Sequence, residues 1–158
     1  MKVFRAPEPV PAQALSHSLF LAGGIGAGAP VPDWQSELVA RLRDTNWTLL
    51  NPRRDHYPAY DPNALREQIK WEHRYLRAAS AISFWFPPET LCPITLYELG
   101  AWTYWRDENG KAKPLVVGAH PDYLKRADVV IQLGLVRPEI EVVGSLDELE
   151  AQIRRVLK

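Results

Sequence analysis

The chain has 158 residues and a formal net charge of zero, with 19 Lys and Arg against 19 Asp and Glu. This length suits a single domain, residues 1–158, with one buried core. The balanced charge argues against polymeric nucleic acid or an anionic membrane as a partner. The single cysteine, Cys92, excludes an internal disulfide and a multi-cysteine zinc site, and it predicts a reducing, cytoplasmic location.

Other sequence signals are mostly negative. The N-terminal residues lack the apolar run of a signal peptide, and no later stretch is long and apolar enough to span a membrane. We therefore expect no membrane partner. Nothing indicates a cofactor. The histidines are scattered without the spacing of metal ligands, so no metal site is predicted; they are His17, His56, His73 and His120.

Strand and helix signals alternate along the chain from Ser18 onward. Five short apolar runs predict strands, which span 18–22, 47–52, 81–86, 114–118 and 139–144. The first run ends in the glycine-rich loop G-G-I-G-A-G-A-P, which continues neither a helix nor a strand. Five segments with helical spacing follow these runs, at 34–43, 61–78, 93–106, 121–133 and 145–157.

Capping residues support these helix boundaries. Asp33, Asp61 and Ser145 stand at predicted N-caps, and Pro62 occupies the first helical position after Asp61. The third strand run, A-I-S-F-W-F, is apolar on both faces, as a parallel strand between two helix layers must be. The fivefold alternation predicts a single-domain α/β fold with a five-stranded parallel sheet, a flavodoxin- or Rossmann-like three-layer sandwich.

One residue stands out against this pattern. Glu98 is the only charged residue between Thr90 and Trp105. An ionised carboxylate taken out of water without a partner costs several kcal/mol, or its pKa rises until it is neutral. Glu98 is therefore either a functional group or one half of a structural ion pair, with Arg53 or Arg74 as the partner.

In an open parallel sheet, ligands bind at the carboxyl ends of the strands. Glu98 lies in the second turn of the helix after the third strand, so it can face that crevice. Glu72 lies midway along the preceding helix, and it either reaches the same crevice or is a solvated residue that pairs with Gln68 or Arg74.

The chain carries, in this order, S-L-F-L-A-G-G-I, D-W-Q, N-P-R-R, W-E-H-R-Y-L-R-A-A-S-A-I-S-F-W-F and L-Y-E-L-G-A-W. These segments resemble the nucleoside 2-deoxyribosyltransferase family, and most closely its nucleoside 2-deoxyribosyltransferase-like branch. S-L-F-L-A-G-G-I is similar to the family's first strand and loop, and L-Y-E-L-G-A-W is similar to its nucleophile helix. Together they cover most of residues 18–106. Ser80, Cys92 and Phe20 depart from residues common in the family, which implies a different base pocket.

The resemblance implies that Glu98 is the nucleophile that attacks the anomeric carbon of a nucleoside or nucleotide. It implies that Glu72 manages the proton on the leaving base. Gly23 and Gly24 would let backbone N–H groups approach the substrate. Arg53 and Arg54 are candidates for contact with a 5′-phosphate, or else surface charges. Trp34 and Trp85 are the best candidates for stacking on a base. The full set of predicted substrate-binding residues is Gly23, Gly24, Asp33, Trp34, Asn51, Arg53, Trp85 and Phe86.

Three functions remain open from the sequence. The first is an enzyme that transfers a sugar between bases or hydrolyses the N-glycosidic bond, and the second is a catalytically silent nucleotide sensor. The third is an interaction protein whose aromatic helix, 93–105, is mainly an oligomer surface. That helix is apolar nearly all round, and members of the family form oligomers, so we expect a homo-oligomer with Tyr104 and Trp105 in contact.

Overall fold

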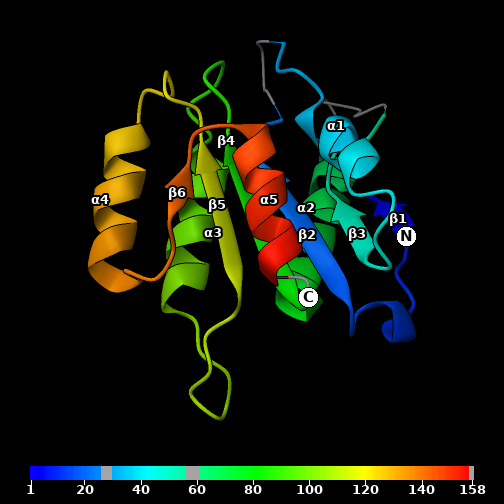
Figure 1. Cartoon of the computed structure of the whole chain (residues 1–158). Helices are drawn as coiled ribbons and strands as arrows, with labels where there is room; N and C mark the ends of the chain where they lie inside the picture. The colour runs from blue at the N-terminus through cyan, green and yellow to red at the C-terminus, as the bar shows by residue number, and fades with distance from the viewer. Residues whose placement is uncertain (26–29, 56–60, 157–158) are drawn as a thin grey trace.

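The computed structural model describes residues 1–25, 30–55 and 61–156, which form one six-stranded sheet (Figure 1). Every strand pair in this sheet is parallel. In sheet order the strands are β1 (Lys2–Arg5), β3 (Thr48–Asn51), β2 (Ser18–Gly23), β4 (Ala81–Phe86), β5 (Leu115–Ala119) and β6 (Val142–Val143). The open parallel sheet is confirmed, and the predicted number of strands was one too few.

Helices cover both faces of the sheet (Figure 1). One face carries α1 (Trp34–Arg41) and α5 (Leu146–Val156). The other carries α2 (Pro62–Ala78), α3 (Pro93–Tyr104) and α4 (Arg126–Val136). A short 3-10 helix, Ala12–Ala14, precedes β2. The three-layer arrangement predicted from the alternation of strands and helices is therefore present.

The missed strand is β1, at the edge of the sheet, where Lys2 lies opposite Thr48 of β3. Its four residues, K-V-F-R, are too few to show a clear alternation, and prolines follow them closely. At the other edge, β6 has two residues rather than the six predicted at 139–144. Helix α4 begins at Arg126 instead of Pro121, because the N–H groups of Tyr123 and Arg126 donate to carbonyls three residues back and form turns.

The strand order places a topological switch point at β2. From β2 the chain moves outward through α1 to β3, then crosses back through α2 to β4 on the other side of β2. The two connections lie on opposite faces of the sheet (Figure 1). A crevice at the carboxyl ends of β2 and β4 is the usual ligand site in this topology.

The N-caps predicted from sequence are confirmed. The Asp33 carboxylate accepts a hydrogen bond from the N–H of Ser36, at 3.0 Å, at the start of α1. Asp61 accepts from the N–H of Asn63, at 2.8 Å, and Pro62 is the first residue of α2. These caps fix where two helices begin, and so they fix the depth at which later side chains of α1 and α2 meet the sheet.

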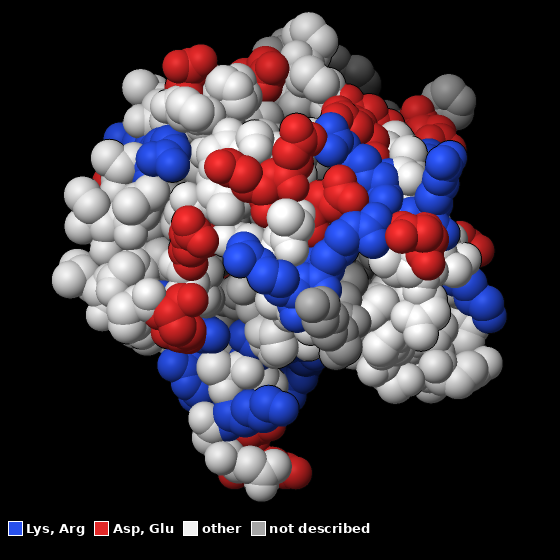
Figure 2. Space-filling view, in the orientation of Figure 1, with Lys and Arg blue, Asp and Glu red and all other residues white. Residues whose placement is uncertain are grey.

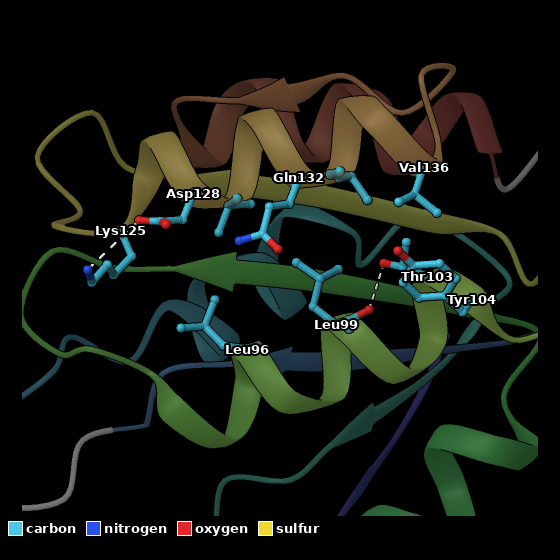
Figure 3. A pocket seen from close by; sticks show the side chains of 11 residues that line it. Leu96, Leu99, Thr103, Tyr104, Lys125, Asp128, Gln132 and Val136 are labelled. Atoms are coloured by element: carbon cyan, nitrogen blue, oxygen red, sulfur yellow. Dashed lines mark hydrogen bonds and ion pairs between the residues drawn. The ribbon is translucent and has the colours of Figure 1, made fainter.

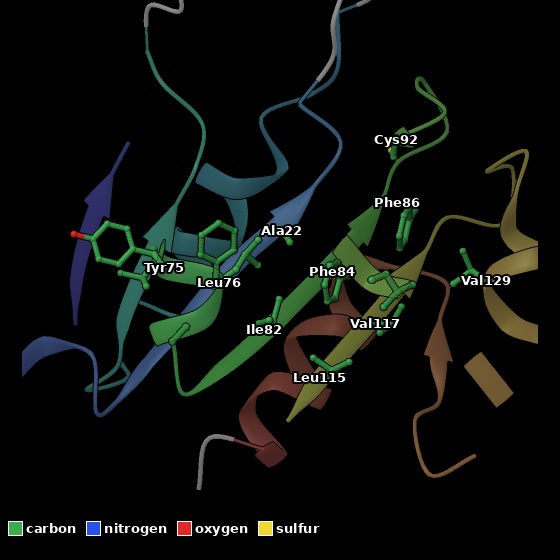
Figure 4. Close-up of a cluster of buried hydrophobic side chains, with 14 of the residues drawn as sticks. Ala22, Tyr75, Leu76, Ile82, Phe84, Phe86, Cys92, Leu115, Val117 and Val129 are labelled. Atoms are coloured by element: carbon green, nitrogen blue, oxygen red, sulfur yellow. The ribbon is translucent and has the colours of Figure 1, made fainter. Parts of the chain in front are cut away.

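Alternate residues of the strands feed two separate cores. Phe84 and Phe86 point into the core between the sheet and α2, α3 and α4, part of which Figure 4 shows. Trp85 points into the other core, beneath α1 and α5. Because successive side chains of a strand lie on opposite faces, a residue's position in β4 decides which helices it can meet.

Acidic and basic side chains are interspersed on the face formed by α1 and α5 (Figure 2). There Arg41 pairs with Asp147 and Glu150 of α5, and Arg154 pairs with Asp44. Such pairs leave little net field on this face, in keeping with the zero net charge. In the part of the chain that the structure describes, no helix is long and apolar enough to cross a membrane.

Candidate active site

Helices α2 and α3 bring Glu72 and Glu98 to the same height above one face of the sheet. Each glutamate lies seven residues before the C-cap of its helix, Ala79 for α2 and Trp105 for α3. The Lys113 ammonium joins the two helix ends, because it donates to the Ala79 carbonyl at 2.6 Å and lies 5.4 Å from the Trp105 ring centroid. The two carboxylates therefore occupy matching positions on parallel helices.

The side of α3 that carries Glu98 is turned toward α2. Trp102 is one helical turn further along this side, and its ring lies 4.8 Å from the Lys113 ammonium at the end of α2. The charge of Glu72 also reaches Glu98. The two glutamates thus belong to a single site between α2 and α3.

Glu98 is partly buried, and within the described residues neither a hydrogen bond nor an ion pair reaches its carboxylate. Burial, and then the negative charge of Glu72, raise the pKa of Glu98 to about 8. The structural ion pairs considered from sequence are not formed. Arg53 donates instead to the carbonyls of Val31 and Pro32, and Arg74 lies over the ring of Tyr75.

Glu72 has different surroundings although it is also partly buried. Its Oε1 accepts a hydrogen bond of 2.7 Å from Gln68 Nε2, one turn earlier in α2. Burial raises the pKa of Glu72, while the Gln68 hydrogen bond and the positive charge of Arg54 oppose the rise. The pairing with Gln68 considered from sequence is therefore present, but in a desolvated position. Glu72 has support for its negative charge, and Glu98 has none among these groups.

The two predicted glycines lie at the end of β2, where the chain packs too tightly for a side chain. A Cβ at Gly23 would lie 2.4 Å from the Trp85 carbonyl oxygen, and one at Gly24 would lie 2.7 Å from Cys92 Sγ. The Gly24 N–H donates to the Trp85 carbonyl at 3.3 Å. In this structure the close approach that glycine permits is made to neighbouring protein atoms of β4 and its loop.

The predicted aromatic residues are buried. Trp34 is 2% exposed and donates its indole N–H to the Gly24 carbonyl at 2.8 Å. Trp85 is 4% exposed and belongs to the α1 and α5 core, across the sheet from the carboxylates. Phe86 shares the face of the carboxylates, but it is fully buried against Tyr123. All three support the crevice from within, and none offers a free ring face for stacking.

The remaining predicted residues form one cluster at the end of β3. Arg53 lies between the α1 cap, where Asp33 is 3.6 Å away, and Gln35, whose Oε1 accepts at 3.2 Å. Asn51 Oδ1 accepts from the Arg53 N–H at 2.9 Å. Asn51 lies on the same side of β3 as Leu49, which belongs to the core beneath α1. This cluster therefore borders the switch point from the face opposite Glu72 and Glu98.

Ser80 lies away from the crevice. It immediately precedes β4, so it stands at the amino end of that strand, and its hydroxyl donates to the Leu15 carbonyl at 2.9 Å. The crevice lies at the carboxyl end. This departure from the family therefore lies away from the two carboxylates.

A groove of about 340 Å³ lies on the other side of α3, between α3 and α4 (Figure 3). Leu96, Leu99 and Thr103 line one wall, and Asp128 and Gln132 belong to the other. Neither Glu72 nor Glu98 lines it. The groove is mostly apolar, and it is separated from the two carboxylates by the body of α3.

A protein-family model covers the part of the chain that holds both glutamates. The family model described as nucleoside 2-deoxyribosyltransferase like matches residues 16–123, more than half of the chain. The chain belongs to this family. No curated protein matches the sequence.

The part that matches the nucleoside 2-deoxyribosyltransferase-like family runs from just before β2 to the turn before α4. It contains both glutamates and the switch point between β2 and β4. The elements outside it are β1 and the short 3-10 helix at one end of the chain, and α4, β6 and α5 at the other. The family match and the site geometry thus fall on the same part of the fold.

Sequence reasoning missed the supporting role of Gln68 and Arg54. Gln68 stands four residues before Glu72, and this spacing was read as the mark of a solvated pair. Arg54 was considered only with Arg53 as a phosphate ligand or surface charge. The signal that sets Gln68 apart is that it is only 8% exposed, which the helical pattern of α2 does not reveal.

No group of three or more His, Cys, Asp and Glu side chains in the described residues could hold a metal ion. His56 lies outside those residues. The candidate chemistry therefore rests on two carboxyl groups with different environments, one supported by hydrogen bonding and one not. Such pairs separate an acid from a base at a single pH.

Proposed function

We propose that this protein cleaves the N-glycosidic bond of a nucleoside through a covalent glycosyl intermediate on Glu98. The sugar is then passed to another base or to water. The observation that carries this proposal is the partly buried Glu98 carboxylate, unpaired within the described residues and beside a second carboxyl group. A binding module that only senses a nucleotide gains nothing from such an unfavourable charge, whereas a glycosyl-transfer enzyme uses it.

In the first half of the reaction, a Glu98 oxygen forms a bond to the anomeric carbon. The bond from that carbon to the base nitrogen breaks, and its electron pair leaves with the base. The base gains a proton from Glu72, which becomes a carboxylate. As positive charge develops on the sugar, the Glu98 anion next to it is stabilised, and poor solvation makes this stabilisation larger.

The second half reverses these roles. Glu72, now a carboxylate, removes a proton from an incoming base or from water. The incoming atom bonds to the anomeric carbon, and the bond to Glu98 breaks. Two substitutions at one carbon retain its configuration, and carboxyl groups about 5 Å apart suit this course.

The proton arrangement at rest differs from the arrangement needed for attack. Burial and the charge of Glu72 favour a proton on Glu98, while Gln68 and Arg54 favour the Glu72 anion. A pair that holds one proton reaches the reactive form when that proton moves from Glu98 to Glu72. This requirement predicts that activity falls both at low pH, where both groups are protonated, and at high pH, where neither is.

The arginines after β3 favour a substrate without a phosphate group. Arg53 donates to Val31, Pro32 and Gln35, and Arg54 donates to Gln68 and Glu67. Guanidinium groups with several protein acceptors would have to give these up to bind a phosphate. We therefore propose a nucleoside, and a deoxynucleoside by analogy with the family name, as the substrate class.

We also propose a homo-oligomer built on α3. The exposed apolar residues of this helix are Ile94, Tyr97 and Tyr104, which are 66%, 77% and 69% exposed. Aromatic side chains exposed to this extent are typical of protein interfaces. Trp105 is less suited to this role than expected from sequence, because it is partly buried against Trp102 and Lys113 within the same chain.

The decisive experiment is mass spectrometry of the intact protein mixed with 2′-deoxynucleosides, and separately with their 5′-monophosphates. We expect a deoxyribosyl adduct on the wild type that maps to Glu98, and free base in solution. Glu98→Ala should give neither product while keeping its circular dichroism spectrum. Base release by Glu98→Ala at the wild-type rate would refute the assignment of the nucleophile. A preference for monophosphates would refute the inference drawn from the arginines.

A further inference from the structure

The amide of Gln68 makes three hydrogen bonds, and together they fix its orientation. Its Nε2 donates to the Pro52 carbonyl and to Glu72 Oε1, both at 2.7 Å. Its Oε1 accepts from Arg54 Nε at 2.6 Å. A flipped amide would place its oxygen against two acceptors and its NH₂ against a donor, so the partners determine the orientation.

Arg54 is held in place as well. Its side chain is 9% exposed, and its Nη2 donates to Glu67 Oε2 at 2.9 Å in addition to the Gln68 contact. Pro52 and Arg54 both follow β3, so their contacts tie α2 to the carboxyl end of that strand. A chain of contacts therefore runs from the sheet, through Arg54 and Gln68, to the carboxylate of Glu72.

We propose that Arg54 and Gln68 are positioning residues that hold Glu72 in the site and stabilise its negative charge. Neither needs to touch the substrate, since both act through the Glu72 carboxylate. This inference builds on the proposed function, but its physical content, control of one carboxyl group by two neighbours, can be tested without any substrate.

The charged groups around Glu72 decide the direction of the effect. Arg54 approaches from the segment after β3 and favours the Glu72 anion, whereas Glu98 approaches from α3 and opposes a second negative charge. Glu67 lies against Arg54 and reduces its influence. Because Glu72 receives the only support of the pair within the described residues, it ionises first and Glu98 ionises second.

We call the contacts that run through Arg54 and Gln68 to Glu72 the relay. Its loss should shift the first ionisation of the two glutamates and leave the second in place. Without Arg54 or Gln68, the Glu72 anion is less stable, so the first loss of a proton from the pair shifts to higher pH. The second loss takes a proton from Glu98 while Glu72 is already charged. The relay supports Glu72 equally before and after that step, so the second ionisation should not move.

The test uses full-length Gln68→Met and Arg54→Met, with Arg66→Met as the matched control. Arg66 is an exposed residue of α2, and its substitution removes the same positive charge as Arg54→Met without removing a contact of Gln68. Carboxyl ¹³C NMR follows the titration of both glutamates, with signals assigned from Glu72→Gln and Glu98→Gln. We expect the pKa of Glu72 to rise by roughly one unit in both relay variants and to stay in place in the control.

If the proposed function also holds, the acid limb of the pH profile of kcat/KM should shift to higher pH together with the Glu72 titration. The alkaline limb should stay in place. We expect kcat to fall, because the Glu72 anion that Arg54 and Gln68 stabilise is the base of the second half of the reaction. An unchanged Glu72 titration in both relay variants would overturn the inference. A shifted Glu72 titration in a protein that releases no base would support the positioning role of Arg54 and Gln68 and refute only the proposed enzymatic function.

Discussion

Replacing Glu98 with Gln should raise the free energy of unfolding above that of the wild type by more at alkaline pH than at acid pH. The native state holds a proton on Glu98 up to a pKa of about 8, whereas the ordinary value is 4.5. Between these values the native state binds more protons than the unfolded state, so the free energy of unfolding of the wild type falls as pH rises. Gln keeps the shape of the side chain and does not ionise, so the variant avoids this loss.

The size of the effect follows from the two pKa values. At about 1.4 kcal/mol per pH unit, the pKa of about 8 against 4.5 gives the wild type a loss of about 3 kcal/mol between pH 5.5 and pH 8.5. Glu98 is only partly buried, so water screens part of this penalty. We expect about half of that value, or about 1.5 kcal/mol, in the difference between the wild type and Glu98→Gln.

Urea unfolding of both proteins at pH 5.5 and pH 8.5 measures this difference directly. All other ionisable groups are shared, so their contributions cancel when the two proteins are compared at one pH. Glu108→Gln is the control, because Glu108 is exposed in the turn that follows α3. A Glu98→Gln effect that is the same at both pH values would show that Glu98 ionises normally, and the unfavourable charge that supports the nucleophile assignment would be absent.

Three other substitutions test separate features of the site and its frame. Glu72→Gln should slow base release most for poor leaving groups, because they depend most on a proton from Glu72; equal slowing in a series of leaving groups would indicate positioning instead. Lys113→Met removes three hydrogen bonds to carbonyls at the end of α2 and should cost about 2 kcal/mol in urea unfolding, and an unchanged midpoint would contradict this. Tyr104→Glu should give smaller particles by light scattering and lower activity together, whereas a fully active wild-type monomer at micromolar concentration would exclude the proposed oligomer.

The architecture could be predicted because its signals are local. Apolar runs fix the strands β2 to β5, and Asp33 and Asp61 fix the starts of α1 and α2. The alternation of strands and helices then leaves few topologies. The two edge strands carry weaker signals. β1 has four residues and β6 has two, and short strands bounded by polar residues do not stand out from loops.

The site could be predicted only in part, because its details depend on helix rotation and on contacts between distant segments. The isolation of Glu98 was visible as a lone charge in an apolar stretch. That Trp85 faces away from Glu98 follows from its place in β4, which the apolar run alone does not orient. The support of Glu72 by Arg54 joins two residues 18 positions apart, and no sequence period brings them together.

The opposite environments of the two carboxyl groups explain how one site can hold both a nucleophile and an acid. With the pKa of Glu98 raised to about 8, the proton shared by the pair rests mainly on Glu98 at pH 7, so the reactive form, with Glu98 ionised and Glu72 protonated, is a minor one. The same high pKa makes the anion more basic, and it gains more from an adjacent oxocarbenium-like sugar than a well-solvated carboxylate would.

Arg54 and Gln68 add to the cost of forming the Glu98 anion, since they favour charge on Glu72 and so leave the proton on Glu98. They also supply what the second half of the reaction requires, because after the base has left, a stabilised Glu72 anion is the base that must activate the incoming group. The arrangement therefore slows entry into the reactive form and supports the return from the intermediate, which is the behaviour expected of a site that must resolve a covalent glycosyl-enzyme as well as form it.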